Sequence, residues 1–175
     1  CSVCGLVKRP IMNRVAYEGE YAAIATGHNL DDEAATLVQN VLHWQTDYLQ
    51  RQAPDLPSVH PKLAHKVKPL CHLYEREMAA YALVQGVEFV EQSCPYSAKA
   101  KTIFYKKILN QLERRSPGTK MQFYSLFLQA KGRGTLRFGP DEPDEKEPYN
   151  TCRICGQPTL AGDLCAFCRL WEAQS

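Results

Sequence analysis

The sequence predicts an α/β fold with a doubly wound parallel sheet, followed by a small zinc ribbon. Two observations predict the sheet. A helix, a glycine and a short apolar strand follow one another at residues 9–25, and the same order returns at residues 74–90. Such alternation of helices and strands is typical of parallel sheets. A third observation predicts the ribbon: two C-x2-C pairs, separated by nine residues, stand near the end of the chain.

The bulk composition sets limits on the function. The chain has 175 residues, 45% of them hydrophobic, and a net charge of +2. This length suits one domain with a real core and a small extra module. A charge this low gives no global field, so any binding of nucleic acid must come from a local cluster. No apolar run approaches the roughly 20 residues of a membrane span. We find no leader with a basic part followed by an apolar part, so the sequence gives no support for secretion. The first residue is Cys rather than Met, which we interpret as the sign of a fragment or a processed product.

The first elements are a helix and a strand. Pro10 is tolerated only in a first helical turn, so we expect the helix to begin near Arg9 and to end at Gly19. Before it, Cys1 and Cys4 form a C-x2-C pair, the spacing of a metal knuckle. Residues 21–25 are small or apolar, which suits a strand buried on both faces.

The next stretch is a strand-to-helix turn rich in polar residues. Gly27 permits a tight turn, and Asn29 is a good N-cap with Asp32 at a capping-box position. Apolar residues then recur at helical spacing over residues 34–42. The polar side chains should therefore lie at the carboxyl end of a strand, where open α/β sheets bind their ligands. The alternative is that the acids at residues 31–33 only compensate the helix dipole.

Residues 44–70 are irregular and contain four prolines, a pattern typical of a functional or mobile region. A helix over residues 74–85 and a strand over residues 87–90 follow. Cys94 lies just past the carboxyl end of that strand, so topology places it on the same sheet edge as the polar turn.

A long helix is expected from Ser97 to Arg115, with a second helix over residues 119–130. Seven basic residues and one acid lie between residues 99 and 120. Such a run is usually a solvated helix face, but its one-sidedness also suits contact with the phosphates of a nucleic acid. The candidate contact residues are Lys99, Lys101, Lys106, Lys107, Arg114 and Arg115.

The end of the chain is a linker and a metal module. Residues 131–148 contain three glycines, three prolines and an acidic run, the composition of a linker. Residues 149–175 hold the paired C-x2-C motifs, and a module this small cannot fold without its metal. We therefore predict one structural zinc, held by Cys152, Cys155, Cys165 and Cys168.

Several of these motifs together resemble one family. The phrase Ala-Thr-Gly-His-Asn-Leu-Asp-Asp-Glu-Ala at residues 25–34 resembles the second signature of the PP-loop ATP pyrophosphatases that 2-thiolate tRNA. It is most similar to that of the TtuA-type tRNA 2-thiouridine synthetases. Cys-x2-Cys-Gly-x2-Lys at residues 1–8, Lys68-Pro69-Leu70, Cys94-Pro95 and the terminal ribbon also match. The resemblance covers nearly the whole chain and implies that residues 1–130 are the carboxyl half of a Rossmann-like PP-loop domain.

The family's Ser-Gly-Gly-x-Asp-Ser phosphate loop is absent from these 175 residues and would lie upstream of Cys1. We therefore expect this chain alone to be inactive. In the family, ATP adenylates the C2 oxygen of a tRNA uridine, and sulfur then displaces AMP. The resemblance implies that Cys1, Cys4 and Cys94 hold a [4Fe–4S] cluster, that Asp32 and Lys8 are catalytic, and that ATP with Mg²⁺ is a substrate. It also implies that ATP or substrate is bound by Gly27, His28, Asn29 and Asp31.

The implied partners are tRNA, a sulfur carrier protein with a C-terminal thiocarboxylate, and a second copy of the chain in a homodimer. The implied location is the cytoplasm, with no membrane contact. Cys71 is left out of the cluster because buried cysteine is common as a small hydrophobic residue. Zinc is the main rival metal for the three thiolates. Two alternatives stay open: a non-catalytic zinc-ribbon protein that binds RNA, and a related enzyme that makes 2-thiocytidine.

Overall fold

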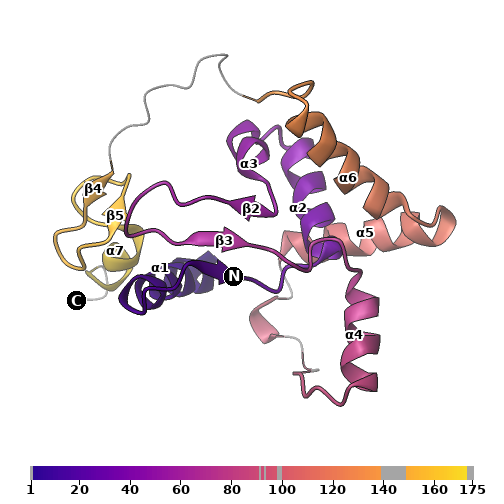
Figure 1. Ribbon diagram of the computed structural model, residues 1–175, viewed down its shortest axis with the longest axis horizontal. Coiled ribbons are helices and arrows are strands. Elements are labelled where there is room, and N and C mark those ends of the chain that lie inside the picture. Colours follow the sequence, from indigo (N-terminus) through magenta and orange to yellow (C-terminus); the bar gives the residue numbers. More distant parts are fainter. Residues whose placement is uncertain (1, 91, 93, 98–99, 139–148, 173–175) are drawn as a thin grey trace. The chain divides into compact units, whose positions relative to one another are not determined.

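Helices dominate the structure, a computed structural model that describes residues 2–90, 92, 94–97, 100–138 and 149–172 (Figure 1). The helices are α1 (Ser2–Glu18), α2 (Leu30–Leu42), α3 (Thr46–Arg51), α4 (Glu75–Val84), α5 (Lys101–Arg115), α6 (Thr119–Gly132) and α7 (Ala166–Glu172). The strands are β1 (Ala23–Ala25), β2 (Asp55–Leu56), β3 (His65–Val67), β4 (Asn150–Thr151) and β5 (Pro158–Thr159). A 3-10 turn covers Pro95–Ser97. None of the described helices combines the length and the apolar character that crossing a membrane requires.

The chain divides into two compact units, each built from separate stretches. Unit 1 comprises residues 1–25, 55–67 and 140–175, and unit 2 comprises residues 26–54 and 68–139. The sequence instead predicts consecutive domains over residues 1–130 and 149–175, joined by a linker over residues 131–148. Helix α6 runs two residues into that linker, to Gly132. Residues 139–148 of the linker lie outside the described residues, so the predicted domain boundaries stay a prediction.

The larger sheet of unit 1 has the order β1–β3–β2 and is mixed. β1 runs parallel to β3, with Ala23 opposite His65, whereas β2 runs antiparallel to β3. The α/β class is thus confirmed, but the described strands form only one parallel pair of the doubly wound sheet. The strand predicted at residues 87–90 is irregular, and all its residues are exposed. β-Branched residues favour a strand only where a neighbouring strand pairs with them and packing covers them, so this run stays unpaired.

Helix α1 begins much earlier than the sequence predicts. It starts at Ser2 and carries Pro10 in its interior, so the start expected near Arg9 is wrong. Proline removes one backbone hydrogen bond from a helix, and packing of the second half offsets that loss. Ala16 is buried, and the side chain of Asn13 accepts a hydrogen bond from the Ala64 N–H at 3.2 Å. The helix is therefore fixed by tertiary contacts within unit 1 rather than by local preference.

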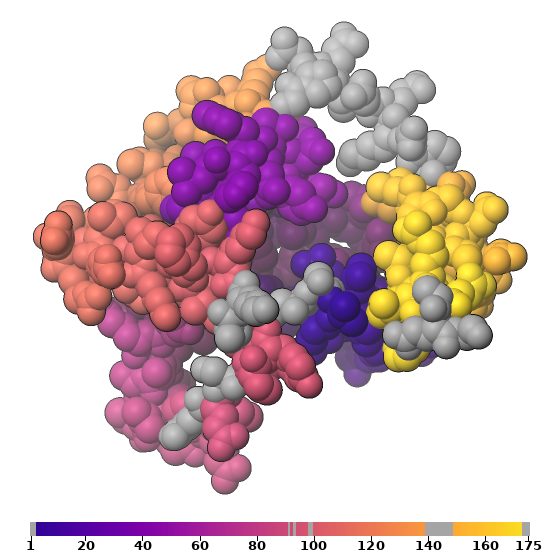
Figure 2. All heavy atoms as spheres, turned by 180° about the vertical axis from the view of Figure 1, so that it is seen from behind, coloured from indigo at the N-terminus to yellow at the C-terminus, as the bar shows by residue number. Residues whose placement is uncertain are grey.

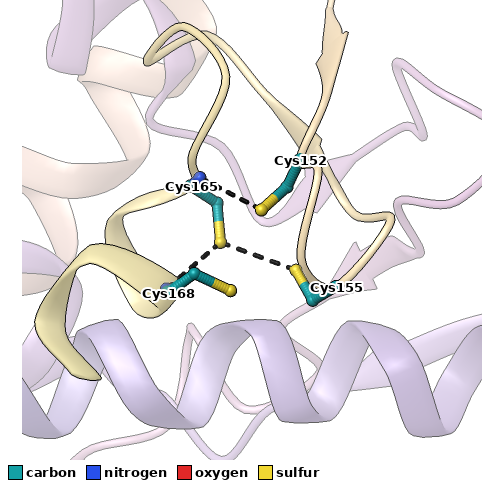
Figure 3. Close-up of side chains that lie close together, drawn as sticks. All are labelled: Cys152, Cys155, Cys165 and Cys168. Carbon is teal, nitrogen blue, oxygen red and sulfur yellow. Dashed lines mark hydrogen bonds between the residues drawn. The ribbon is translucent and has the colours of Figure 1, made fainter. Parts of the chain in front are cut away.

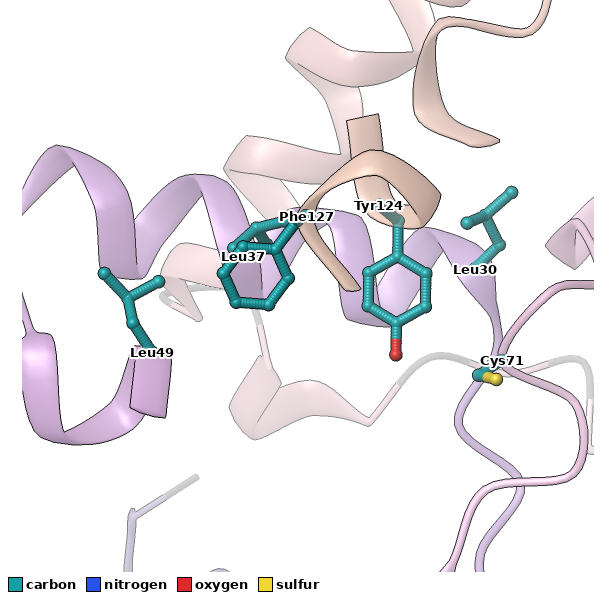
Figure 4. Packing of buried hydrophobic residues seen from close by; sticks show 6 residues of the cluster. All are labelled: Leu30, Leu37, Leu49, Cys71, Tyr124 and Phe127. Carbon is teal, nitrogen blue, oxygen red and sulfur yellow. The ribbon is translucent and has the colours of Figure 1, made fainter. Parts of the chain in front are cut away.

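Unit 2 is a helical unit in which α2 packs against α5 and α6. Figure 4 shows its main core, with the ring of Phe127 from α6 near Leu37 of α2 and the ring of Tyr124 between this pair and Leu30. Leu30, Leu49 and Cys71 complete this cluster, and a smaller cluster joins Ala34 and Ala35 to Leu109 of α5. The apolar spacing predicted for residues 34–42 thus supplies the buried face of α2.

The ribbon at the end of the chain is part of unit 1. β4 and β5 form a two-stranded antiparallel sheet, and α7 contacts α1. Lys62, in the loop between β2 and β3, donates a hydrogen bond to the Gly156 carbonyl at 3.0 Å. Gly156 follows the first cysteine pair and has a φ of 67°, a left-handed conformation that glycine adopts without strain.

Candidate functional site

The turn between β1 and α2 has the cap that the sequence predicts. Asn29 is extended and buried, and its side chain accepts a hydrogen bond from the Asp32 N–H at 3.0 Å. In return, the Asn29 N–H donates to Oδ2 of Asp32 at 3.2 Å. This reciprocal capping box fixes the first turn of α2. It also gives one of the two carboxylate oxygens of Asp32 a backbone partner.

Three consecutive acids in this turn pair with lysines from three different segments. Asp31 meets Lys120 of α6 at 2.5 Å, Asp32 meets Lys106 of α5 at 2.7 Å, and Glu33 meets Lys68 at 2.9 Å. The side chains of Asp31 and Glu33 are only 4% exposed, whereas that of Asp32 is 32% exposed. Of these three acids, Asp32 is therefore the most accessible to solvent.

Asp31 already uses both carboxylate oxygens inside unit 2. Oδ1 faces Lys120, and Oδ2 accepts the backbone N–H of Glu75 at 2.8 Å. Lys120 also donates to the side chain of Asn110 at 2.7 Å. These contacts tie α2 to α4, α5 and α6. The geometry thus gives Asp31 a structural role, while its expected contact with ATP or substrate stays a prediction.

Glu33 anchors a second buried network. It accepts hydrogen bonds from Lys68 at 2.9 Å and from the Tyr124 hydroxyl at 3.2 Å. Burial and the neighbouring Glu33 carboxylate raise the pKa of Tyr124, so this phenol stays protonated and donates. Burial, and then the Glu33 carboxylate, also raise the pKa of the Cys71 thiol. Cys71 is therefore a buried core residue whose thiol ionises less readily than a free cysteine.

Lys106 stands apart from its basic neighbours on α5. Its Nζ contacts both Oδ1 of Asp32 at 2.7 Å and Oε1 of Glu75 at 3.2 Å. Burial alone would lower the pKa of Lys106, but the two carboxylates outweigh burial and raise it. The sequence gives no sign of this pairing, because Lys106 lies 74 residues after Asp32 (106 minus 32).

The other basic residues predicted to contact nucleic acid have mixed positions. Lys101, Lys107, Arg114 and Arg115 are exposed on α5, which lies at the surface of unit 2 (Figure 2). Lys99 lies outside the described residues. Four of the six therefore remain available on one helix for contact with phosphates.

Gly27 and His28 are both exposed in the turn before α2. A Cβ added to Gly27 would meet no atom within 4 Å, and its φ is not left-handed. The turn itself therefore does not need glycine, which corrects the expectation that Gly27 serves the bend. His28 Nδ1 lies 2.9 Å from the Thr26 hydroxyl.

The cysteines expected to hold a cluster fall in both units. In unit 1, Cys4 and Lys8 are exposed and share one face of α1, because they are four residues apart. Cys4 sits in a regular helical turn of α1, and the expected knuckle of Cys1 and Cys4 stays a prediction. In unit 2, Cys94 is exposed, and its carbonyl accepts hydrogen bonds from the hydroxyl and the N–H of Ser97 at 2.6 and 2.9 Å. Ser97 thus fixes the Cys94 turn rather than capping α5, which begins at Lys101. Cys1 lies outside the described residues.

The four ribbon cysteines converge on one point (Figure 3). Their Sγ atoms all lie within 4.8 Å of one another, and those of Cys155 and Cys165 are 3.6 Å apart. Four thiolates around a single tetrahedral zinc lie about 3.8 Å apart, as follows from a Zn–S distance near 2.3 Å. Burial would raise the pKa of Cys152, but backbone N–H groups of Cys165, Cys155 and Ile154 lower it to about 6. Burial and the neighbouring thiols raise the pKa of Cys168. By the distances between its sulfur atoms, the donor set fits one metal ion.

Comparison with known proteins identifies the class of protein to which this architecture is related. The chain that contains the four-cysteine ribbon and the capped acidic turn is related to the tRNA 2-thiolation sulfurtransferases. The chain is 49% identical over 171 residues to a tRNA-5-methyluridine(54) 2-sulfurtransferase of Pyrococcus horikoshii, covering 98% of this chain and 53% of that protein. It is 46% identical over 171 residues to the Thermotoga maritima protein of the same name, with coverages of 97% and 53%. These matches confirm the resemblance to the TtuA-type enzymes.

The fold gives an independent match. The U34-tRNA thiolase NcsA from Methanococcus maripaludis, solved with its [4Fe–4S] cluster, superposes with a TM-score of 0.72 at 26% identity. The alignment covers 99% of this chain and 52% of that one. No protein-family model matches the chain. The chain spans about half the length of the curated relatives that it matches.

Proposed function

We propose that this chain is the carboxyl half of an enzyme that 2-thiolates a uridine of tRNA. The observation that carries the proposal is the match to tRNA-5-methyluridine(54) 2-sulfurtransferases over 98% of the chain. The capped turn with its one accessible acid, Asp32, agrees with it, because such a turn positions polar groups at the end of a strand. The enzyme would act in the cytoplasm, on tRNA.

In the proposed reaction, ATP adenylates the C2 oxygen of the uridine, and sulfur then replaces the oxygen as AMP leaves. The phosphate loop for ATP is not among these 175 residues. This chain would instead supply Asp32 and Lys8 beside the uridine, with Gly27, His28 and Asn29 lining the adjoining turn. The exposed backbone of Gly27 suits close approach by a ligand, because no side chain covers it.

Cys1, Cys4 and Cys94 would bind the [4Fe–4S] cluster. Cys4 and Cys94 are exposed thiols, so packing does not block access to them, whereas Cys71 is buried in the core. Three protein thiolates leave one iron of such a cluster without a protein ligand. When bound, the cluster would supply an iron site that accepts sulfur from a carrier protein with a C-terminal thiocarboxylate.

Two further roles complete the proposal. Zinc would bind Cys152, Cys155, Cys165 and Cys168 as a closed structural site, which suits their burial and mutual distances. The exposed basic residues of α5 would contact tRNA phosphates, and a homodimer would be the working form.

The decisive test removes the charge of Asp32 in the full-length protein. Asp32→Asn keeps an oxygen for the Asn29 N–H, so we expect a stability loss of only about 1 kcal/mol. Thiolation, followed by mass analysis of tRNA nucleosides, should be abolished. If activity and stability fell together, the capping role alone would explain Asp32.

The same nucleoside analysis on cells that lack the gene tests the activity itself. Loss of one 2-thiouridine species is the expected result. Loss of 2-thiocytidine would indicate the related thiolase. Unchanged nucleosides, together with tRNA binding by the purified protein, would indicate a non-catalytic binding protein.

A further inference from the structure

We infer that Lys106 is a positioning residue for Asp32 and not a phosphate contact like its neighbours on α5. This inference rests on the proposed function, because it assumes that Asp32 acts on the uridine. It changes the role that the one-sided basic run suggests for this lysine. It also adds a residue to the site that the turn before α2 does not contain.

The carboxylate of Asp32 is held at both ends. Oδ2 accepts the Asn29 N–H at 3.2 Å, and Oδ1 lies 2.7 Å from the Nζ of Lys106. One contact comes from the turn itself and the other from α5, a different element. Two contacts on opposite oxygens fix the rotation of the carboxylate, which a capping box alone would leave partly free.

Lys106 is itself held by a second carboxylate. Its Nζ lies 3.2 Å from Oε1 of Glu75, and its side chain is 18% exposed. Glu75 is anchored in turn, because its backbone N–H donates to Asp31 at 2.8 Å. An ammonium has three N–H donors, and two are directed to these acids. A tRNA phosphate would therefore compete with two carboxylates for Lys106.

The other acids of the turn have cations of their own. Asp31 pairs with Lys120 of α6 and Glu33 with Lys68. Among the described residues, Lys106 is the cation that balances Asp32. Loss of Lys106 would leave Asp32 beside Glu75 without a counter-charge, and both side chains are exposed enough to turn toward water. The carboxylate would then lose its fixed direction.

The test compares two adjacent lysines in the full-length protein. Lys106→Met should lower kcat for thiolation on the order of 10- to 100-fold, as misplaced catalytic groups do, with little change in KM for tRNA. Lys107→Met is the matched contrast, because Lys107 is exposed one residue further along α5. It should weaken tRNA binding and lower the slope of log K against log salt by about 1. That slope should be unchanged in Lys106→Met.

Two more variants separate positioning from loss of fold. Lys106→Arg keeps a cation that can reach two carboxylates, so it should recover most of the kcat that Lys106→Met loses. Glu75→Gln should lower kcat less than Lys106→Met does, because the Asp32 contact remains. Thermal unfolding of each variant shows whether the fold is intact.

A Lys106→Met enzyme with unchanged kcat and a reduced salt slope would overturn the inference, because Lys106 would then be a phosphate contact. Should Lys106→Met fail to fold, Lys106→Gln takes its place, and an unchanged kcat with a reduced salt slope in that variant would overturn the inference equally. Failure of the proposed function is distinct: the unmodified enzyme would form no 2-thiouridine, or Asp32→Asn would remain fully active.

Discussion

At the scale of single residues, the main feature is that the acids of the α2 turn are neutralised one by one. Asp31 and Glu33 are buried with their lysines, and breaking a buried pair typically costs 3–5 kcal/mol, about the net stability that a small core supplies. Asp32 is less buried, so loss of its partner lysine should cost less free energy of unfolding. The turn therefore combines two acids that build the fold with one whose side chain stays partly exposed.

The cysteines allow a prediction at the same scale. In the full-length protein reconstituted anaerobically with iron and sulfide, Cys94→Ser should lose iron and the visible absorbance of the cluster. Cys71→Ala should keep both, because Cys71 packs beside Leu30 and Tyr124 and its pKa is raised by burial. Iron analysis and visible spectra of the two variants measure this. The opposite pattern would place the third ligand at Cys71. Uptake of zinc alone would show that these cysteines bind zinc and not an iron–sulfur cluster.

At the scale of elements, the turn between α5 and α6 has an unusual cap. The N-cap position of α6 is Gly118, with a φ of 89° and no side chain to offer. Glu113, near the end of α5, accepts the backbone N–H groups of Gly118 at 2.5 Å and of Lys120 at 2.8 Å. The hydroxyl of Tyr74 adds a third hydrogen bond at 3.2 Å. One carboxylate thus caps the next helix and joins it to the start of α4.

This cap should make stability depend on pH. Burial alone would raise the pKa of Glu113, but the N–H groups of Lys120 and Gly118 and the Tyr74 hydroxyl lower it below its ordinary value of 4.5. The contribution of Glu113 is therefore complete above about pH 4.5 and is lost as the pH falls through its folded-state pKa. Glu113→Gln should cost about 1–3 kcal/mol at pH 7, and the difference from the unmodified chain should shrink in acid.

Urea unfolding at several pH values measures this effect. Glu88→Gln is the matched control, because Glu88 is exposed in an irregular segment. It should change neither the stability nor its pH dependence. A difference between Glu113→Gln and the unmodified chain that stayed constant into acid would show that the carboxylate contributes by packing and not by charge.

At the scale of the whole molecule, the features that could be predicted from the sequence are those that depend on neighbours in the chain. The capping box needs only Asn29 and Asp32, three residues apart, and the metal ligands need only their C-x2-C spacing. The rest depends on partners that the sequence does not mark. Lys120 is 89 residues from Asp31, and β3 forms in a stretch of prolines because β1 and β2 pair with it. Likewise, α1 continues past Pro10 because the second half of this helix is packed within unit 1.

Metal binding by the ribbon should affect the structure of unit 1. Its α7 contacts α1, and its Gly156 carbonyl accepts a hydrogen bond from Lys62, so unit 1 includes the ribbon. We expect one zinc per chain, and we expect Cys155→Ser to lose it and to unfold the ribbon with its contacts. Hydrogen exchange should then increase over residues 149–172 and at Lys62, while α2, α5 and α6 stay protected. Protection of the ribbon without bound metal would contradict a structural role for zinc.

The discontinuous build of unit 1 has a consequence for the order in which the protein is made. Synthesis runs from the amino end, and the described part of unit 2 is complete once residue 138 has emerged. Unit 1 must wait for its last stretch, although its first stretch is made before all of unit 2. During that interval α1 and β1 lack the ribbon that later packs against α1. Translation time therefore separates the completion of the two units, and unit 1 is the part that a nascent-chain chaperone would find unfinished.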